Sequence, residues 1–267
     1  MLIALMIKTY IAIRGWYDPS WLRRNRGVIK RFPFDLILKI GRDDVASEAA
    51  TVNFIRSNTT IPVPHVVASD SAFGRSYMLM RRVEGMPLEF AWPDLDAGQR
   101  ANVVEQLRSF AAQLRTLSPT LSRGHSVHAV CALNNASFWD SRISSAPTGP
   151  FPDERAFNDH LVAVAERYMD ETTLPAIRAR MRDDHRICFT HGDLAPRNIM
   201  VQGDNVTAII DWEEAGWYPE HWEIVKALWC TLKDPEWLSA VRRIVGDDLE
   251  RDWMVDRELS DHMVGAF

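Results

Sequence analysis

The segment over residues 190–201, Thr-His-Gly-Asp-Leu-Ala-Pro-Arg-Asn-Ile-Met-Val, constrains the fold of this chain more than any other. Its apolar end and a second apolar, β-prone run flank the turn-forming Gly-Asp-Asn at 203–205, and this pattern predicts a hairpin. The hairpin would return Asp211 to the neighbourhood of Asn198, which lies five positions after Asp193. The spacing therefore predicts that two carboxylates and one amide gather at a single site.

These three side chains match the needs of phosphoryl transfer from a nucleotide. We assign Asp193 as the catalytic base that orients and deprotonates the attacking hydroxyl, and Asn198 and Asp211 as ligands of Mg²⁺. We expect His191 to hydrogen-bond backbone groups around the second metal ligand instead of reacting itself. Arg197 either pairs with Asp193 or faces solvent, and the sequence leaves both arrangements open.

A second pair of candidate residues lies far upstream of this segment. Lys39 is the only lysine within the apolar strand expected over residues 36–40, where a charge needs a partner. Glu48, in the first turn of the helix expected over residues 44–58, is the natural partner. Such a pair would direct the ammonium group of the lysine toward the phosphates of a nucleotide.

Composition limits the partners of the protein. The 267 residues carry a net charge of −5, which argues against nucleic acid as the main partner because such binding relies on a basic surface. The three cysteines are far apart and odd in number, which favours a reducing compartment, and we expect a cytoplasmic protein, monomeric by default. The apolar run over residues 1–7 is too short to span a bilayer, so we expect no membrane partner and expect this run to pack on the first part of the chain.

Hydrophobic periodicity divides the chain into two parts. β-prone runs and one helix occupy the first 84 residues, and helical periodicity dominates from residue 85 onward. We therefore predict an α+β fold with a small, β-rich, nucleotide-binding N-lobe over residues 1–84. A larger, mainly helical C-lobe over residues 85–267 would carry the catalytic loop and the substrate region. The expected strands are 27–31, 36–40, 66–69 and 77–82, the expected C-lobe helices are 99–117, 155–170, 175–183, 221–232 and 235–245, and residues 118–152 are expected to form a long loop or insertion.

The chemistry-bearing segments resemble a known family. The His-Gly-Asp at 191–193 with Asn198, and the run Ile-Asp-Trp-Glu-Glu-Ala-Gly-Trp-Tyr-Pro-Glu at 210–220, are similar to the aminoglycoside phosphotransferase and choline kinase family, especially to its uncharacterised fungal members. The similarity extends more loosely over residues 27–232. It implies a two-lobed protein-kinase-like fold, the use of ATP with Mg²⁺, and transfer of the γ-phosphate to a hydroxyl of a small molecule. It also implies the roles assigned above to Asp193, Asn198 and Asp211, with Lys39 and Glu48 as the pair that binds the phosphates.

The resemblance also implies where the nucleotide would bind, and the sequence departs from the family in one part of that region. Residues 80–83 would be the hinge between the lobes, where backbone groups of Arg81 and Val83 would hydrogen-bond adenine. Family members place a nucleotide-covering loop between two strands ahead of the lysine, whereas here only residues 23–27 precede a pair of short strands. Either residues 3–16 supply the missing strand or the lobe is abbreviated.

The acceptor would bind in the C-lobe, between the segment 118–170 and the residues that follow Asp211. Acidic side chains there could receive an amine-bearing alcohol, could be solvated, or could lie at the start of the next helix. These side chains are Glu213, Glu214, Glu220 and Glu223. Trp217 and Tyr218 are the aromatic residues that we first expect to line a pocket.

Two alternative functions compete with this interpretation. A protein kinase is disfavoured because Gly192 replaces the usual arginine, Trp-Glu at 212–213 replaces Phe-Gly, and only 56 residues follow Asp211. The other alternative is a non-catalytic kinase-like protein that binds a nucleotide or a partner. The short region ahead of Lys39 favours it, and the intact set of Asp193, Asn198 and Asp211 argues against it.

Overall fold

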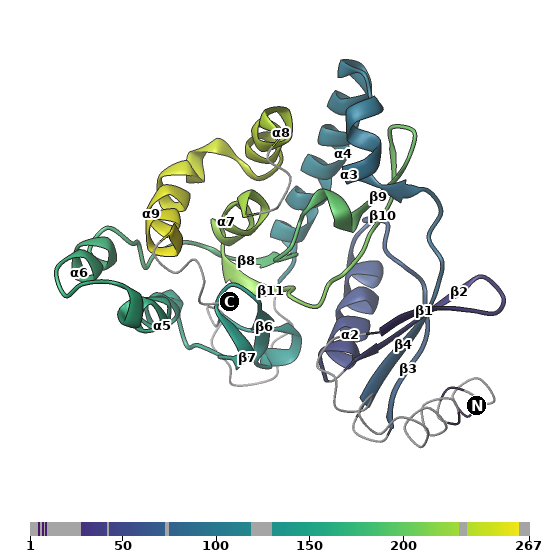
Figure 1. Cartoon of the computed structure of the whole chain (residues 1–267), viewed down its shortest axis with the longest axis horizontal. Coiled ribbons are helices and arrows are strands. Elements are labelled where there is room, and N and C mark those ends of the chain that lie inside the picture. Colours follow the sequence, from purple (N-terminus) through teal and green to yellow (C-terminus); the bar gives the residue numbers. More distant parts are fainter. Residues whose placement is uncertain are drawn as a thin grey trace.

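Four antiparallel strands form a sheet in the first part of the computed structural model, in the order β1-β2-β4-β3 (Figure 1). The structure describes residues 5, 7, 9, 28–41, 43–72, 75–118, 130–229 and 234–261. The strands of this sheet are β1 (Val28–Phe32), β2 (Leu36–Gly41), β3 (Val66–Ala72) and β4 (Arg75–Arg81). Their places agree with the sequence prediction to within a few residues.

The two faces of this sheet are covered differently. Helix α2 (Asp43–Asn58) packs on one face, where Val45 and Ala49 contact Met78. Successive side chains of a strand point to opposite faces, so Leu38 lies on the face opposite Lys39. Leu38 is buried there in a cluster that includes Ile7, which confirms for that residue that the apolar N-terminal run packs on the first part of the chain.

The chain leaves the four-stranded sheet after β4 and joins another sheet at once. The carbonyl oxygen of Glu84 accepts a hydrogen bond from Thr207 Oγ1 at 2.7 Å. Gly85 has a φ of +95°, and a side chain there would overlap the backbone of Val201. Glycine is therefore required at this close approach. Strand β5 (Met86–Pro87) then pairs with β9 (Ile199–Gln202), which in turn pairs with β10 (Asn205–Ile209).

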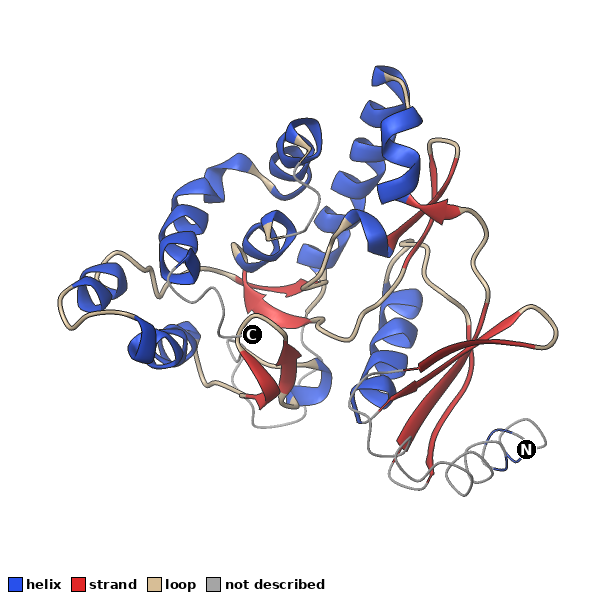
Figure 2. Cartoon of the chain, in the orientation of Figure 1, coloured by secondary structure: helices blue, strands red, loops and turns tan. Residues whose placement is uncertain are grey.

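Helices are the main regular structure among the described residues of the remaining chain (Figure 2). The long helix α4 begins at a capping box in which Asp96 and Gln99 each accept a hydrogen bond from the other's backbone N–H. The helices are α3 (Leu88–Ala91), α4 (Ala97–Thr116), α5 (Glu154–Ala165), α6 (Thr173–Arg178), α7 (Trp222–Leu228), α8 (Pro235–Val245) and α9 (Glu250–Asp261). Two short antiparallel pairs of strands accompany them, β6 (Phe138–Asp140) with β7 (Ser144–Thr148) and β8 (Ile187–Thr190) with β11 (Gly216–Pro219).

The helical part differs from the sequence prediction in several places. Helix α9 was not expected, because seven of its twelve residues are charged and its short apolar stripe is a weak signal. That stripe, Val255 and Leu259, becomes core because it packs in a cluster with residues of α5, α6 and α7. The expected insertion contains the pair β6–β7, although its residues 119–129 lie outside the described part. α5 and α6 are shorter than expected, and α5 continues as a 3-10 turn over Glu166–Tyr168.

Among the described residues, no helix is both long enough and apolar enough to cross a bilayer.

Candidate active site

Asp193 lies in the loop that follows β8, and its carboxylate is held from two sides. Arg197 donates from Nη2 to both of its oxygens, at 2.6 and 2.5 Å. Asn198, at the end of a 3-10 turn (Pro196–Asn198), donates from Nδ2 to Asp193 Oδ2 at 2.7 Å and to the Asp193 carbonyl oxygen at 2.9 Å. The contact settles the alternative left open by the sequence, because Arg197 pairs with Asp193. Two neighbours thus fix the direction of this carboxylate.

The hairpin β9–β10 brings Asp211 back beside this loop. Its strands pair with Ile199 opposite Ile209, and the backbone N–H of Ile210 donates to the carbonyl oxygen of Asn198 at 2.9 Å. The predicted hairpin is therefore present, and it places the residue before Asp211 in contact with the loop of Asp193. Asp211 has a φ of +67°, a conformation that aspartate and asparagine adopt more readily than most residues.

His191 connects the two segments through its buried ring. Nε2 donates to the carbonyl oxygen of Ile210 at 3.1 Å, and Nδ1 accepts the backbone N–H of Asp193 at 3.1 Å. A neutral imidazole with its proton on Nε2 satisfies both contacts. Burial lowers the pKa of His191, which favours this neutral form. The prediction that His191 organises backbone around the second candidate metal ligand is confirmed.

Glu223, at the start of α7, holds the same loop through hydrogen bonds from the loop's backbone. Its Oε2 accepts the backbone N–H of His191 at 2.7 Å, and the carboxylate also accepts the backbone N–H of Gly192. Burial raises the pKa of Glu223 to about 7. Of the three alternatives expected for Glu223, the structure supports a place at the start of the next helix, because Glu223 lies in the first turn of α7. It is not a solvated acid, because its side chain is buried against the loop. The available signal was an acid among apolar residues in an otherwise buried helix.

Lys39 joins the four-stranded sheet to the hairpin. Its Nζ lies 2.7 Å from Glu48 Oε2, 2.6 Å from Asp211 Oδ1 and 2.9 Å from Glu213 Oε2. Burial alone would lower the pKa of Lys39, but these three carboxylates outweigh it and raise the pKa. Glu48 Oε1 also accepts the backbone N–H of Trp212 at 3.3 Å. The expected Lys39–Glu48 pair is present, and Glu213 contacts this lysine although the sequence interpretation placed it near the acceptor.

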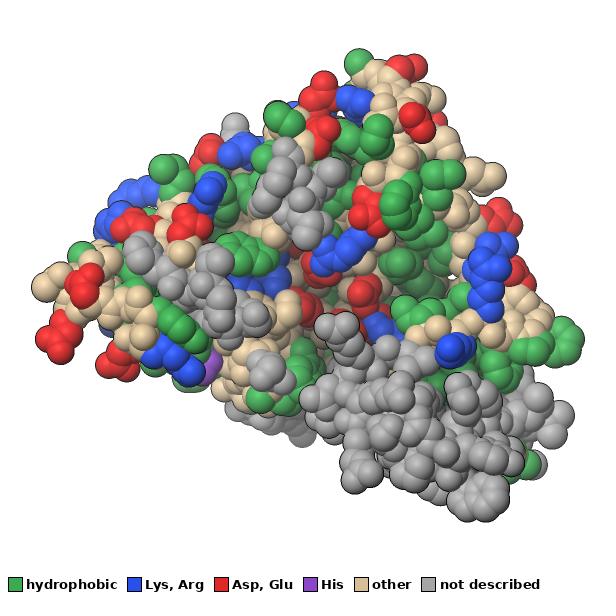
Figure 3. Space-filling view, viewed as in Figure 1, with side chains coloured by type: hydrophobic (Ala, Val, Ile, Leu, Met, Phe, Trp, Pro, Cys, Tyr) green, Lys and Arg blue, Asp and Glu red, His purple; other side chains and the backbone are tan. Residues whose placement is uncertain are grey.

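A pocket of about 260 Å³ opens beside Lys39 and Asp211. Figure 3 shows acidic and basic side chains in the hollow between the sheet and the helical part. Arg81 and Val83, the expected hinge residues, line the pocket. The backbone N–H of Arg81 donates to the carbonyl oxygen of His65 at 2.9 Å, so Arg81 can offer its carbonyl oxygen but not its N–H to a ligand. The apolar lining consists of Ile29, Ile37, Val52, Pro64, Met78, Met80, Met200 and Ile210.

The nucleotide-covering segments expected at 3–16 and 23–27 lie outside the described residues, apart from positions 5, 7 and 9. The two alternatives for that region, an upstream strand or an abbreviated lobe, both stay open.

The remaining acids and aromatic residues after Asp211 have structural partners. Glu214 accepts from Lys226 Nζ at 2.6 Å and from the backbone N–H of Ser141 at 3.1 Å, which ties this loop to the turn after β6. Trp217 and Tyr218 lie in β11 and are buried in the core. The expectation that these two aromatic side chains line a pocket is therefore wrong, because the pairing of β11 with β8 turns the segment into the interior.

Gly192 allows the loop of Asp193 to approach the residues after Asp211. We expect Gly192→Ala to destabilise the protein more than Gly203→Ala, because both residues have positive φ, +78° and +60°, but only a side chain at 192 would overlap the backbone of Glu214. The positive φ should lower the free energy of unfolding by about 1–2 kcal/mol in each variant. The overlap should remove roughly 1–3 kcal/mol more at position 192. Urea unfolding of both variants measures the difference, and equal losses would contradict the close approach.

Comparison with known proteins agrees with this geometry. The model of the phosphotransferase enzyme family matches residues 11–258. Two subtelomeric hrmA-associated cluster proteins, from two strains of Aspergillus fumigatus, are each 35% identical to this chain over 89 residues, which cover 32% of the chain and only 17% of either relative.

Solved structures show the same fold at low identity. A type VIII aminoglycoside-3'-phosphotransferase superposes with a TM-score of 0.54 at 19% identity, over 85% of this chain and 84% of that chain. APH(2'')-IIa in a ternary complex with streptomycin and ATP superposes with a TM-score of 0.56 at 12% identity, over 89% of this chain and 82% of that chain. The family match, which covers most of the sequence, shows that the chain belongs to the phosphotransferase enzyme family and has its protein-kinase-like fold.

Proposed function

We propose that this protein transfers the γ-phosphate of ATP, with Mg²⁺, to a hydroxyl group of a small molecule. The observation that carries the proposal is the meeting of two distant parts of the chain at one pocket. Lys39 from the sheet contacts Asp211 at 2.6 Å, and the hairpin that carries Asp211 holds it beside the loop of Asp193 and Asn198. A carboxylate base, oxygen ligands and a cation for phosphate are the parts that phosphoryl transfer requires.

The donor atoms around Asp211 fit Mg²⁺. Asn198 Nδ2 already donates to Asp193, which leaves its Oδ1 as the atom available to a metal. Asp211 keeps 37% of its side chain exposed and supplies a carboxylate, and hard oxygen ligands of these two kinds are those that Mg²⁺ prefers. ATP would supply the transferable phosphate, and Mg²⁺ bound with it would neutralise the charge of the phosphates.

The chain's own residues would then divide the work. Asp193, oriented by Arg197 and Asn198, would accept the proton of the attacking hydroxyl. Lys39 would exchange some of its carboxylate partners for phosphate oxygens, with Glu48 keeping it in place. The Arg81 carbonyl and the Val83 backbone would bind adenine at the hinge of the pocket.

The proposal also takes residues 1–84 as the nucleotide-binding lobe and 85–267 as the lobe that carries the base and the acceptor. The change of sheet between β4 and β5 supports this division. We place the reaction in the cytoplasm, in keeping with Cys131 and Cys188, which are buried thiols and not joined in a disulfide.

Calorimetric titration with ATP, with and without Mg²⁺, tests the proposal first. We expect saturable binding that is strongest with Mg²⁺. Lys39→Met should weaken it at least about tenfold, or about 1.4 kcal/mol, whereas Lys30→Met should not, because Lys30 is exposed on the neighbouring strand. A panel of sugars, amino alcohols and aminoglycosides then tests transfer by release of ADP. Absence of nucleotide binding, or binding without turnover of any acceptor, would support the non-catalytic alternative instead.

A further inference from the structure

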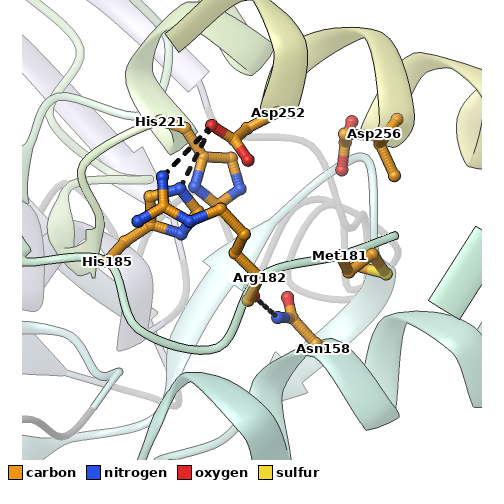
Figure 4. Close-up of a pocket in the computed structure, with 8 residues that line it drawn as sticks. Asn158, Met181, Arg182, His185, His221, Asp252 and Asp256 are labelled. Atoms are coloured by element: carbon orange, nitrogen blue, oxygen red, sulfur yellow. Dashed lines mark hydrogen bonds and ion pairs between the residues drawn. The ribbon is translucent and has the colours of Figure 1, made fainter. Parts of the chain in front are cut away.

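A second cluster of buried titratable side chains shares no residue with the candidate active site. It lies where α5, α7 and α9 meet the segment that leads into β8. Glu154 begins α5, His185 precedes β8, His221 precedes α7 and Asp252 belongs to α9. Figure 4 shows the rings of His185 and His221 beside the carboxylate of Asp252, which dashed lines join to His185 and to Arg182. The four residues are between 3% and 9% exposed, so the cluster is shielded from solvent.

The contacts within this cluster are short but incomplete. His185 Nδ1 lies 2.6 Å from Glu154 Oε1, and His185 Nε2 lies 3.2 Å from Asp252 Oδ2. Glu154 Oε2 accepts the backbone N–H of His185 at 2.8 Å, which fixes the direction of the carboxylate. His221 Nδ1 is buried, has no hydrogen-bond partner within the described chain, and lies 3.9 Å from Glu154 Oε1. A buried polar atom without a partner is costly, so this nitrogen calls for a ligand.

We propose that Glu154, His185 and His221 bind one zinc ion. Suitable donor atoms of these three side chains all lie within 4.8 Å of one another. Donors bound at about 2.0 Å in a tetrahedral site are about 3.3 Å apart. That spacing falls between the 2.6 and 3.9 Å at which Glu154 Oε1 faces the two histidine nitrogens, so small shifts of side chains suffice. Two imidazoles and one carboxylate are a ligand set that zinc accepts.

The surroundings supply the other parts of a zinc site. Asp252 faces the ring nitrogen of His185 that would not bind the metal, and such a carboxylate commonly orients a ligating histidine. A cavity of about 10 Å³ adjoins His185, His221 and Asp252 (Figure 4), which is about the space that one water molecule needs. A water there would be the fourth ligand.

The position of this site gives it a structural consequence. Its ligands come from three segments that are far apart in sequence, so the ion would hold α5, the start of β8 and the start of α7 together. β8 leads to His191, and α7 carries Glu223, which accepts the His191 N–H. Zinc would therefore stabilise the start of β8 and the start of α7, which together position the loop of Asp193. This effect does not depend on whether the protein transfers phosphate.

Zinc titration of the full chain after removal of metal by a chelator tests the proposal. We expect one zinc ion per chain by calorimetry, a rise in melting temperature with zinc, and visible absorption of a four-coordinate site with Co²⁺. His221→Gln should weaken zinc binding at least about hundredfold, and Asp252→Asn about ten- to hundredfold. His160→Gln is the matched control, because His160 lies on α5 outside the cluster. The affinity of this variant for zinc should equal that of the wild type.

The acids around Lys39 are a second place where zinc could bind, since Glu48, Asp211 and Glu213 also lie close together. The titration is therefore repeated with Asp211→Asn, which should keep the zinc-binding stoichiometry of the wild type. Failure of the wild-type chain to bind zinc would show a metal-free ion-pair network and overturn the proposal. Loss of binding in Asp211→Asn but not in His221→Gln would overturn it as well. If His221→Gln does not fold, the Co²⁺ spectrum of the wild type and the Asp252→Asn affinity decide the matter.

Discussion

Replacing Asp193 with alanine is expected to slow phosphoryl transfer about 10²- to 10⁴-fold while leaving the affinity for Mg²⁺ and ATP nearly unchanged. Arg197 and Asn198 hold both carboxylate oxygens of Asp193, and its contacts are with these neighbours instead of with Lys39. A positioned general base contributes about 10²- to 10⁴-fold to a rate, so kcat should fall by that factor. Release of ADP in the presence of an active acceptor gives kcat, and calorimetry gives the affinity for the nucleotide.

Glu105→Ala is the control for this variant, since Glu105 is an exposed acid on α4 whose partner is Arg108. It should keep both the rate and the affinity. Asp193→Asn keeps the size of the side chain and should lose transfer as well, which separates loss of the base from loss of packing. Transfer at more than about a tenth of the wild-type rate in both Asp193 variants would remove this residue from the catalytic role.

Asp211→Asn is expected to remove the dependence of ATP binding on Mg²⁺. Asparagine tolerates the φ of +67° at this position, so the variant changes the charge with little strain on the backbone. The loss of one negative charge replaces a charged metal ligand with a weaker, neutral one, and it removes one of the three carboxylates around Lys39, which lies 2.6 Å from Asp211 Oδ1. Affinity for ATP in the presence of Mg²⁺ should fall at least about tenfold, and affinity without Mg²⁺ should change much less.

Asp204→Asn, in the turn of the same hairpin, is the matched control for Asp211→Asn. Asp204 contacts Asn102 at the far end of the hairpin, away from Lys39. The affinity of the Asp204→Asn variant for ATP should equal that of the wild type, both with and without Mg²⁺. If Asp211→Asn also binds ATP with full affinity and full dependence on Mg²⁺, the assignment of Asp211 as a metal ligand is wrong.

The two variants test different parts of one geometry. Asp193→Ala should lower the rate of transfer but not the affinity for ATP, whereas Asp211→Asn should lower the affinity for ATP in the presence of Mg²⁺. A protein that only binds nucleotide would respond to Asp211→Asn and show no transfer for Asp193→Ala to reduce. The pair of results therefore separates the phosphotransferase from its non-catalytic alternative.

Local patterns predicted the hairpin that carries Asp211, because its strands and turn lie within a dozen residues and depend on propensities of neighbouring residues. α8 was predicted at the residues where it occurs. It begins at a proline, and the side chain of the preceding Asp234 caps its first turn. The weakly apolar α9 and the strand β11 were missed. Their apolar residues become core only through partners that are distant in sequence.

Roles that depend on distant contacts were predicted less well. The Lys39–Glu48 pair was expected because the two residues lie in consecutive elements, but the contact between Lys39 and Glu213 spans 174 positions and was not. Glu223 lies among the apolar residues of α7, a signal that the sequence interpretation did not use, and its contact with the His191 N–H shows its role. Trp217 and Tyr218 were expected in a pocket and lie in the core.

By itself the sequence determined the kind of fold, the loop with Asp193 and Asn198, and the hairpin that returns Asp211. These features arise from apolar periodicity and turn residues, which act over short stretches of chain. Only the tertiary structure decided which charged side chains meet. Glu213 with Lys39, Glu214 with Lys226, and Glu154 with His185 are pairs whose partners come from elements that pack together only in the folded chain. A buried charge is stable only beside such a partner, and sequence spacing does not show which partner the folding of the chain will supply.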